Sequence, residues 1–211
     1  MAETRKSVSA VISAYFEEKT IATVIDKCLF YVDDVIVVND GSTDDTSNEA
    51  KKAGARVIEL EQNMGVKAAI KRGFYEATGD ILVTLDADGQ HDPAEIPKLI
   101  QPILDNKADL VMGVRQSFPH LSEKILTWLT NFRVPCTDAS TGFRAIRREI
   151  AQKMKLKGTC LCGTFVLEAA HLGANVIDVH ISILPRNGPR RIQTRHIIQF
   201  FYVLWDVVRF W

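Results

Sequence analysis

The fold is decided by the stretch Gly79-Asp80-Ile81-Leu82-Val83-Thr84-Leu85-Asp86-Ala87-Asp88-Gly89-Gln90-His91-Asp92-Pro93. Its apolar first half predicts a buried strand, and two aspartates, Asp86 and Asp88, follow at the carboxyl end of that strand. Open α/β sheets bind their ligands at this edge. Two carboxylates on alternate residues can hold a hard divalent cation, and the cation can neutralise a diphosphate. Acidic triplets are also common as helix caps, so the interpretation depends on what lies at the other strand ends.

Strand-like and helix-like segments alternate along the chain, which predicts an α/β fold with a doubly wound, mainly parallel sheet. The expected strands are 7–14, 35–39, 56–60, 80–85, 108–113 and 176–184. The expected helices are 17–30, 43–53, 66–77, 93–105, 121–132, 165–172 and an amphipathic C-terminal helix over 196–211. The stretch 138–144 is turn-rich. No repeat or linker divides the chain, so we expect one domain over 1–195, followed by the apolar and aromatic helix.

Composition and missing motifs exclude several classes of protein. Lys+Arg and Asp+Glu both total 26, so the chain has no charge footprint of a nucleic-acid-binding protein. No Gly-x-Gly-x-x-Gly follows the first strand, which argues against a nicotinamide or flavin enzyme. The cysteines lack paired zinc spacing and are interpreted as reduced structural thiols of a cytosolic protein. We expect no signal peptide, and no apolar run reaches the roughly 20 residues of a membrane span.

A second acidic residue is expected at the same sheet edge. The strand 35–39 runs into Asn39-Asp40-Gly41-Ser42. A carboxylate at this position can accept hydrogen bonds from a nucleotide base or ribose. Alternatively, Asp40 caps the next helix or forms an Asx turn with Gly41.

The C-terminal region combines arginines with aromatic residues. Arg186, Arg190, Arg191 and Arg195 crowd one segment, and guanidinium groups suit phosphate oxygens. Such a run can also be a solvated basic face. The helix 196–211 is either packed on the core or lies at a membrane interface. The stretch from Arg186 to Trp211 contains five arginines and one acidic residue, which favours an anionic partner at a membrane surface.

Five motifs in order along nearly the whole chain carry a family resemblance. They are Val11-Ile12-Ser13-Ala14-Tyr15-Phe16-Glu17, Ile36-Val37-Val38-Asn39-Asp40-Gly41-Ser42-Thr43-Asp44, Asn63-x-Gly65 with Ala69 and Gly73, Leu85-Asp86-Ala87-Asp88-Gly89-Gln90-His91, and Asp138-Ala139-Ser140-Thr141-Gly142-Phe143-Arg144. Together they resemble the family 2 glycosyltransferases of the GT-A fold. The resemblance is greatest to the polyprenyl-phosphate branch, typified by dolichol-phosphate mannosyltransferase. Ser13, Phe16 and Asn39 depart from the family pattern, where proline, asparagine and aspartate are usual.

The resemblance implies a role for each matching residue. Ser13, Tyr15, Glu17 and Asp40 would hold the nucleotide, with Asp40 nearest the base. Asp86, Asp88 and Gln90 would hold Mg²⁺ or Mn²⁺ and, with Ala87, the donor diphosphate. Arg115 follows the fifth strand, and Arg186 and Arg191 belong to a basic loop that contacts donor and acceptor phosphates. Asp88, Arg115 and Asp138 are the expected catalytic residues.

The implied reaction is inverting, metal-dependent transfer of a hexose, mannose or glucose, from a GDP- or UDP-sugar to a polyprenyl (dolichyl) phosphate. The enzyme would be peripheral at the cytoplasmic membrane face. A phosphate acceptor is already ionised, whereas a sugar hydroxyl would need a general base. Asp138 is the candidate base, or it orients Arg144 or the acceptor loop. The alternatives are a soluble saccharide or other hydroxyl acceptor, and an inactive nucleotide-sugar-binding scaffold.

Overall fold

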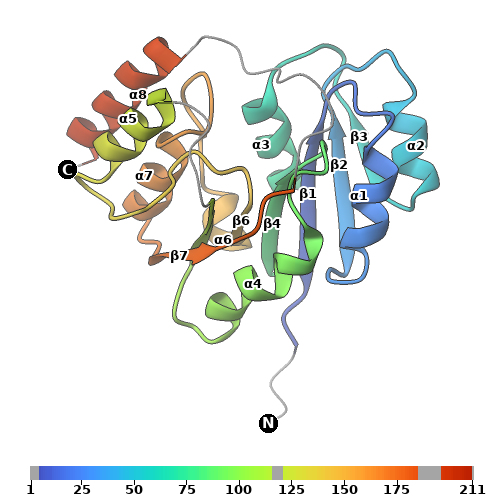
Figure 1. Cartoon of the computed structure of the whole chain (residues 1–211), viewed down its shortest axis with the longest axis horizontal. Coiled ribbons are helices and arrows are strands. Elements are labelled where there is room, and N and C mark those ends of the chain that lie inside the picture. Colours follow the sequence, from blue (N-terminus) through green and yellow to red (C-terminus); the bar gives the residue numbers. More distant parts are fainter. Residues whose placement is uncertain (1–4, 116–120, 185–195, 211) are drawn as a thin grey trace.

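A computed structural model of the chain describes residues 5–115, 121–184 and 196–210 (Figure 1). Its strands form one sheet in the order β3-β2-β1-β4-β6-β5-β7. β6 runs antiparallel to its neighbours β4 and β5, and the other neighbouring pairs are parallel. The predicted α/β fold with a mainly parallel sheet is therefore confirmed. The strands are β1 Val8–Ala14, β2 Asp34–Asn39, β3 Arg56–Glu59, β4 Ile81–Asp86, β5 Leu110–Val114, β6 Arg144–Arg147 and β7 Val176–His180.

Helices cover both faces of the sheet, because alternate residues of the buried strands point to opposite sides. On one face Ala10 and Ile12 of β1 belong to a core shared with α1, α2 and α4. On the other face Val11 belongs to a core shared with α3, α5, α6, α7 and α8. The helices are α1 Ile21–Cys28, α2 Thr46–Lys52, α3 Val66–Glu76, the short 3₁₀ helix η1 Pro93–Glu95, α4 Ile96–Leu104, α5 Leu121–Thr130, α6 Arg148–Ala151, α7 Thr164–His171 and α8 His196–Arg209.

The sequence pattern missed two short elements, β6 and α6. β6 begins at Arg144, the last residue of the stretch expected to be turn-rich, and inserts between β4 and β5. It is four residues long and opens with a buried arginine, so no apolar alternation marks it. The last strand also ends early, at His180, although Ile183 forms an isolated bridge with His91.

Two predicted helices begin later than expected because their first residues form turns. The helix expected from residue 17 begins at Ile21, and the N–H groups of Thr20 and Ile21 donate to the Glu17 carbonyl. The helix expected from residue 43 begins at Thr46, whose N–H donates to Asp44 Oδ1 over 3.2 Å. Both turns lie at the carboxyl edge of the sheet, where they add polar groups to the site.

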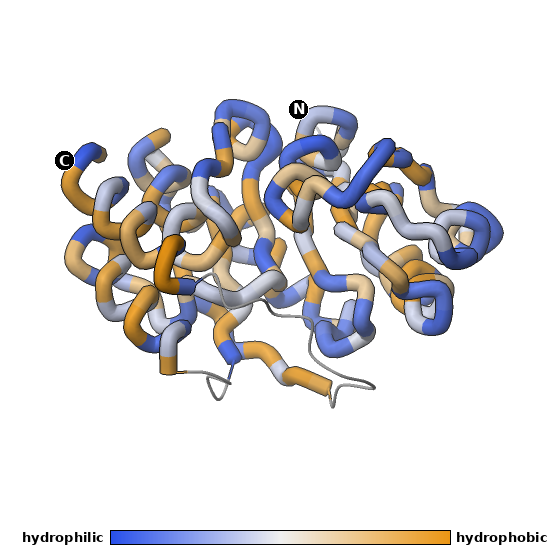
Figure 2. The backbone as a smooth tube through the Cα atoms, turned by 90° about the horizontal axis from the view of Figure 1, so that it is seen from above, coloured by the Kyte–Doolittle hydropathy of each residue, from blue (hydrophilic) through white to orange (hydrophobic). Residues whose placement is uncertain are grey.

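The C-terminal helix α8 packs one face on the core and exposes the other. Val203 and Val207 are buried beside α5 and α7. Ile197, Phe201 and Trp205 point outward and are 75%, 64% and 60% exposed. Hydrophobic residues recur along the helices at the end of the molecule that holds the C-terminus (Figure 2). Within the described residues, no helix is both long enough and apolar enough to cross a bilayer.

Candidate active site

The carboxyl ends of β1, β2 and β4 lie side by side and bring the first motifs together (Figure 1). In the parallel register, Ser13 of β1 is paired with Asp86 of β4 and with Val38 of β2. Ala14 is paired with Asn39, which directly precedes Asp40. The sheet therefore places the nucleotide-side residues and the acidic triplet at one edge, as the sequence predicts.

The acidic triplet forms a tight loop after β4. Gln90 N–H donates to Asp88 Oδ1 over 3.0 Å, and Asp86 N–H donates to His91 Nδ1 over 3.1 Å. The Asp86 side chain is 52% exposed. A Cβ on Gly142 would come within 2.8 Å of Asp86 Oδ2, so a larger residue there would displace this carboxylate.

This loop fits a hard divalent cation. Its donors are carboxylate and amide oxygens, which Mg²⁺ and Mn²⁺ prefer. Among the described residues, no hydrogen bond is donated to the carboxylate of Asp86. Two carboxylates alone leave most of the coordination sphere open, as expected where a substrate diphosphate supplies further ligands.

His91 supports the acidic loop and received no role from the sequence, although it stands in the matching motif. Its ring is buried and stacks on Phe143, with 5.1 Å between centroids. Burial lowers its pKa, against the opposing charges of Asp86 and Asp88. The neutral ring accepts a hydrogen bond at Nδ1, so its proton is on Nε2.

Asp40 is buried, and both of its carboxylate oxygens bind backbone. Met64 N–H donates to Oδ1 over 2.7 Å and Gly65 N–H to Oδ2 over 2.8 Å. Asp40 therefore fixes the start of α3, rather than capping α2 or forming a turn with Gly41 as the alternative interpretation held. Its contact with a base stays a prediction.

Tyr15 and Glu17 lie on the loop that joins β1 to α1. The rings of Tyr15 and Phe16 meet edge to face, with centroids 4.5 Å apart. Phe16 has a positive φ of 55°. The Glu17 carboxylate accepts a hydrogen bond from Thr20 Oγ1 over 2.9 Å. The loop is also held by the turn that follows β2, since Phe16 N–H donates to Ser42 Oγ and Glu17 N–H to Thr46 Oγ1. Ser13 and Tyr15 stay half-buried at the edge.

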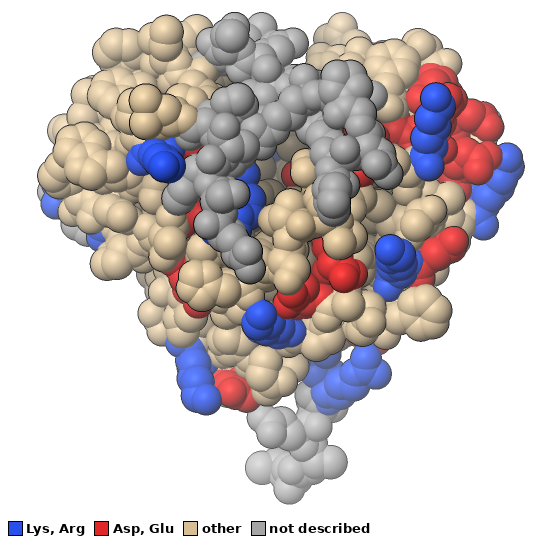
Figure 3. Space-filling model, viewed as in Figure 1, with Lys and Arg blue, Asp and Glu red and all other residues tan. Residues whose placement is uncertain are grey.

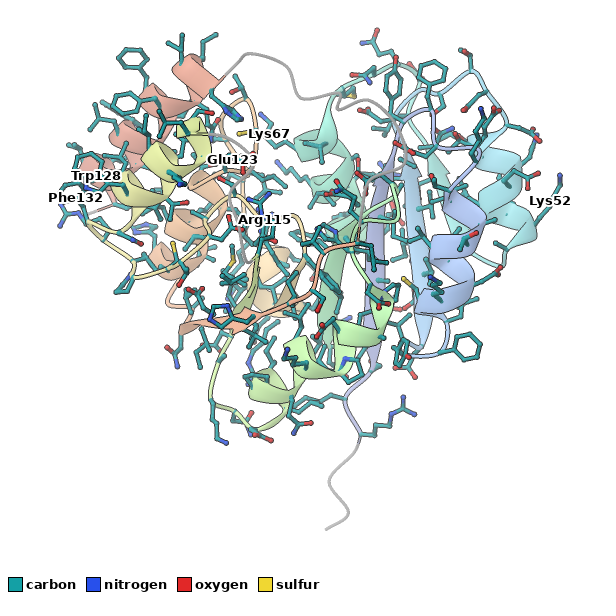
Figure 4. All side chains as sticks on the ribbon, viewed as in Figure 1. Lys52, Lys67, Arg115, Glu123, Trp128 and Phe132 are labelled. Atoms are coloured by element: carbon teal, nitrogen blue, oxygen red, sulfur yellow. The ribbon has the colours of Figure 1, made fainter. Side chains whose placement is uncertain are left out.

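Arg115 sits between two buried carboxylates. Its Nε donates to Asp138 Oδ2 over 2.5 Å, and its Nη2 donates to Asp138 Oδ1 over 2.9 Å and to Glu123 Oε2 over 2.8 Å. Figure 4 shows Arg115, which directly follows β5, and Glu123 of α5, whose side chains meet. Burial alone would lower the pKa of Arg115, but the hydrogen bonds and charges of Asp138 and Glu123 raise it. The sequence did not predict Glu123, because nothing in a helical first turn indicates a partner on another element.

This pairing bears on the two roles considered for Asp138. Ser140 N–H also donates to its Oδ1, over 3.0 Å, so both oxygens are engaged. The geometry favours a positioning role over that of a base, and the arginine it positions is Arg115 rather than Arg144. Arg144 instead stacks on Phe165, 4.4 Å from the ring centroid, and burial lowers its pKa to about 10.

Arg186 and Arg191 lie outside the described residues. The chain enters their segment beside the acidic loop, because Leu184 N–H donates to the Gln90 carbonyl over 2.9 Å and Ile183 pairs with His91. The segment is followed by His196, the first residue of α8. Both of its flanks are therefore fixed to described elements.

Comparison with known proteins gives relatives and solved structures. The Methanococcus voltae protein named UDP-N-acetylglucosamine–dolichyl-phosphate N-acetylglucosaminyltransferase is 30% identical, and the match covers 85% of this chain and 86% of that one. Dolichol-phosphate mannosyltransferase of Pyrococcus furiosus is 32% identical over 71% of this chain, but the match spans only 48% of that enzyme. Among structures, glucosyl-3-phosphoglycerate synthase of Mycobacterium tuberculosis, solved with Mn²⁺, UDP-glucose and phosphoglyceric acid, superposes with a TM-score of 0.80. It is 26% identical, and the match covers 96% of this chain and 79% of that one.

The family itself follows from a match over most of the sequence. Residues 9–166 match the family described as Glycosyl transferase family 2. That range runs from β1 through the acidic loop and the Arg115–Asp138 pair into α7. This chain belongs to glycosyl transferase family 2 and is a glycosyltransferase of the GT-A fold.

Proposed function

We propose that this glycosyltransferase moves a hexose, with inversion, from a nucleotide sugar to a polyprenyl phosphate. The observation that carries the proposal is the engagement of Asp138. Arg115 and Ser140 occupy both of its oxygens, so the site offers no free carboxylate there to deprotonate a hydroxyl. An acceptor phosphate needs no such base. The names of the M. voltae and P. furiosus relatives both contain a dolichyl phosphate but differ in the sugar. They therefore support a polyprenyl phosphate as acceptor and do not favour one donor sugar.

Donor binding is assigned to the edge formed by β1, β2 and β4. Ser13, Tyr15, Glu17 and Asp40 would contact the nucleoside, GDP or UDP, and Ala87 would lie against the diphosphate. Asp86, Asp88 and Gln90 would hold Mg²⁺ or Mn²⁺. The bound cation supplies positive charge where negative charge develops on the leaving diphosphate. The space left at Gly142 and the hydrogen bond from Asp86 N–H to His91 Nδ1 support that role.

The acceptor side is assigned to the basic segment and the apolar surface near it. Arg186 and Arg191 would contact phosphates of donor and acceptor. Four aromatic side chains are exposed there: Trp128 of α5, Phe132 just after α5, and Phe201 and Trp205 of α8. In Figure 3 this side of the molecule is mostly uncharged, whereas acidic and basic side chains gather over α1 and α2. Aromatic residues suit the membrane interface, so we place the enzyme peripherally at the cytoplasmic face.

The decisive experiment measures where the transferred sugar goes. The purified chain is incubated with dolichyl phosphate, Mn²⁺ and GDP-mannose, UDP-glucose or UDP-N-acetylglucosamine, each labelled in the sugar. We expect label in the organic phase as a glycolipid, and none in excess chelator or with Asp88→Asn. Thermal unfolding of Asp88→Asn at the wild-type temperature serves as the control for folding, since Asp88 lies in a strand-end loop.

Two outcomes would contradict the proposal. Label in a water-soluble product, with a saccharide or phosphoglycerate added, would favour a soluble acceptor. Such an acceptor is suggested by the phosphoglyceric acid bound to the M. tuberculosis structure. Nucleotide binding in calorimetry without transfer to any acceptor would favour an inactive scaffold.

A further inference from the structure

We propose that Cys160, Cys162 and His196 form a second metal site, selective for a borderline-soft ion such as Zn²⁺ and separate from the acidic loop. The two sulfurs and an imidazole nitrogen all lie within 4.8 Å of one another. A tetrahedral Zn²⁺ with bonds of about 2.0–2.3 Å separates its ligand atoms by roughly 3.3–3.8 Å. Small side-chain movements therefore suffice to close the site, with a fourth position left for water.

The cysteine loop, residues 158–163, is built against α8. Gln199 is fully buried, and its Oε1 accepts hydrogen bonds from Thr159 N–H over 2.9 Å and Cys160 N–H over 3.1 Å. Its Nε2 donates to the Cys162 carbonyl over 2.8 Å. Gln199 lies three residues after His196, on the same side of the helix. The contacts that hold the loop therefore also bring His196 to the sulfurs.

Two further contacts fix the start of this loop. Lys67 of α3 donates to the Gly158 carbonyl over 2.7 Å (Figure 4). Gly158 has a φ of +102°, and a Cβ there would come within 2.7 Å of Gln199 Oε1. The loop thus has a fixed shape before any ion binds.

The ligand atoms have the supporting contacts that metal sites need. His196 Nδ1 is hydrogen-bonded to Ser122 Oγ of α5 over 2.7 Å, which leaves Nε2 as the ligand atom. Cys162 N–H approaches Cys160 Sγ at 3.4 Å. The buried guanidinium of Arg144 interacts electrostatically with both cysteines, and its Nε and Nη1 have no hydrogen-bond partner among the described residues. Two thiolates would add to the negative charge that Asp86 and Asp138 already provide near this guanidinium.

This proposal revises the interpretation of the cysteines as structural thiols. Cys28 and Cys136 fit that interpretation, since both are buried and burial raises the pKa of each to about 12. Cys160 and Cys162 are only partly buried. The sequence pattern gave no zinc spacing because the third ligand is not local and comes from α8.

A metal ion in this site would hold His196, the residue at which the chain leaves the basic segment and α8 begins. Leu184 already ties the near flank to Gln90. A metal ion on His196 would tie the far flank to the core through the cysteine loop. This consequence rests on the proposed function, whereas the metal site itself does not.

Spectroscopy of the whole chain tests the site without using activity. The chain is prepared free of metal under a phosphine reductant and titrated with Co²⁺. We expect the sulfur-to-cobalt charge-transfer band and the visible bands of tetrahedral Co²⁺, both removed by one equivalent of Zn²⁺. Asp88→Asn should leave these bands unchanged, because it alters only the oxygen site. Cys162→Ser removes one of the two thiolates, so it should weaken the charge-transfer band and weaken Zn²⁺ binding on the order of 100-fold.

A second variant keeps the test valid if Cys162→Ser fails to fold. Ser122→Ala removes only the hydrogen bond to His196 and should weaken Zn²⁺ binding roughly 10- to 100-fold. Cys28→Ala is the matched control and should bind Zn²⁺ as the wild type does. Cobalt spectra without a sulfur band, or Zn²⁺ affinity unchanged in both Cys162→Ser and Ser122→Ala, would overturn the proposal.

Discussion

The contacts of Arg115 determine whether Asp138 can act as a general base. The Arg115 guanidinium binds both carboxylate oxygens of Asp138, so neither is directed at an acceptor hydroxyl. The Arg115 side chain is 13% exposed, and those of its two partners, Asp138 and Glu123, are 1% and 4% exposed, so solvent screens these pairs little. The cluster carries two negative charges and one positive charge. We interpret Asp138 and Glu123 as residues that position Arg115 and take no part in proton transfer.

The first prediction tests that interpretation with two matched variants. Asp138→Asn and Glu123→Gln each remove one charged partner of Arg115. Each should lower kcat/KM by about 10- to 100-fold, the equivalent of one charge-assisted hydrogen bond of about 1.5–3 kcal/mol. The pH dependence of kcat should keep its acid limb in both. An acid limb that disappears in Asp138→Asn alone would identify Asp138 as a general base.

The second prediction separates the two roles of Asp40. In Asp40→Ala the N–H groups of Met64 and Gly65 lose their partner, so the free energy of unfolding should fall by about 1–3 kcal/mol. If Asp40 also contacts the base, donor binding should weaken by a similar amount. Denaturant unfolding and calorimetry measure the two effects separately. Asp40→Asn is the matched variant, since it keeps one acceptor oxygen. Lost stability with unchanged nucleotide affinity would limit Asp40 to its structural role.

At the scale of elements, α8 joins the C-terminal residues to the body of the domain. Gln199 binds the cysteine loop, and Val203 and Val207 fill the space beside α5 and α7. Asp206 is buried on the same face. A buried carboxylate loses hydration when it is charged, which makes this helix sensitive to pH.

The third prediction concerns Asp206. Burial and the nearby charge of Glu168 raise its pKa from 3.8 to about 6, although Arg209, Lys157 and His171 oppose the shift. Because the folded-state pKa is raised, its stabilising contribution is complete below pH 3.8 and is lost as the pH rises through about 6. Asp206→Asn should therefore have a higher Tm than the wild type at pH 7.5 and the same Tm near pH 4. Scanning fluorimetry from pH 4 to 8 checks this, with the exposed Asp26→Asn as control. A Tm difference that does not vary with pH would contradict it.

The elements also set the limit of prediction from sequence. β1, β2 and β4 were predictable because long apolar runs end in polar turns, and the same runs placed Asp40 and Asp86 at one edge. β6 was not, since its packing between β4 and β5 is decided by distant residues. Glu123 and the partners of Cys162 were missed for the same reason. Each depends on contacts between elements far apart in the chain, which local periodicity does not encode.

At the scale of the whole molecule, the site and the apolar surface are joined by one segment. Its near flank contacts the acidic loop through Leu184, and its far flank begins α8. An apolar surface is formed by Trp128 of α5 and Phe132, which follows that helix (Figure 4), together with Phe201 and Trp205 of α8; all four side chains are exposed. We propose that a lipid acceptor is held at that surface and that its phosphate is bound by the arginines that precede α8 in the sequence.

The fourth prediction tests this arrangement. Changing Trp128, Phe132, Phe201 and Trp205 together to serine should leave unfolding nearly unchanged, because exposed side chains each contribute within about 0.5 kcal/mol. Binding to anionic liposomes, measured by co-sedimentation, should be lost. Wild-type binding should weaken with salt, because the arginines act within a Debye length of roughly 8 Å at physiological ionic strength.

Val203→Ala is the opposite control: it should lose stability, since Val203 is 0% exposed, yet still bind liposomes while folded. Removing the whole of α8 should destabilise the chain, because it uncovers the core beside α5 and α7. If the wild-type chain does not bind anionic liposomes at low salt, the membrane placement is refuted and a soluble acceptor is favoured.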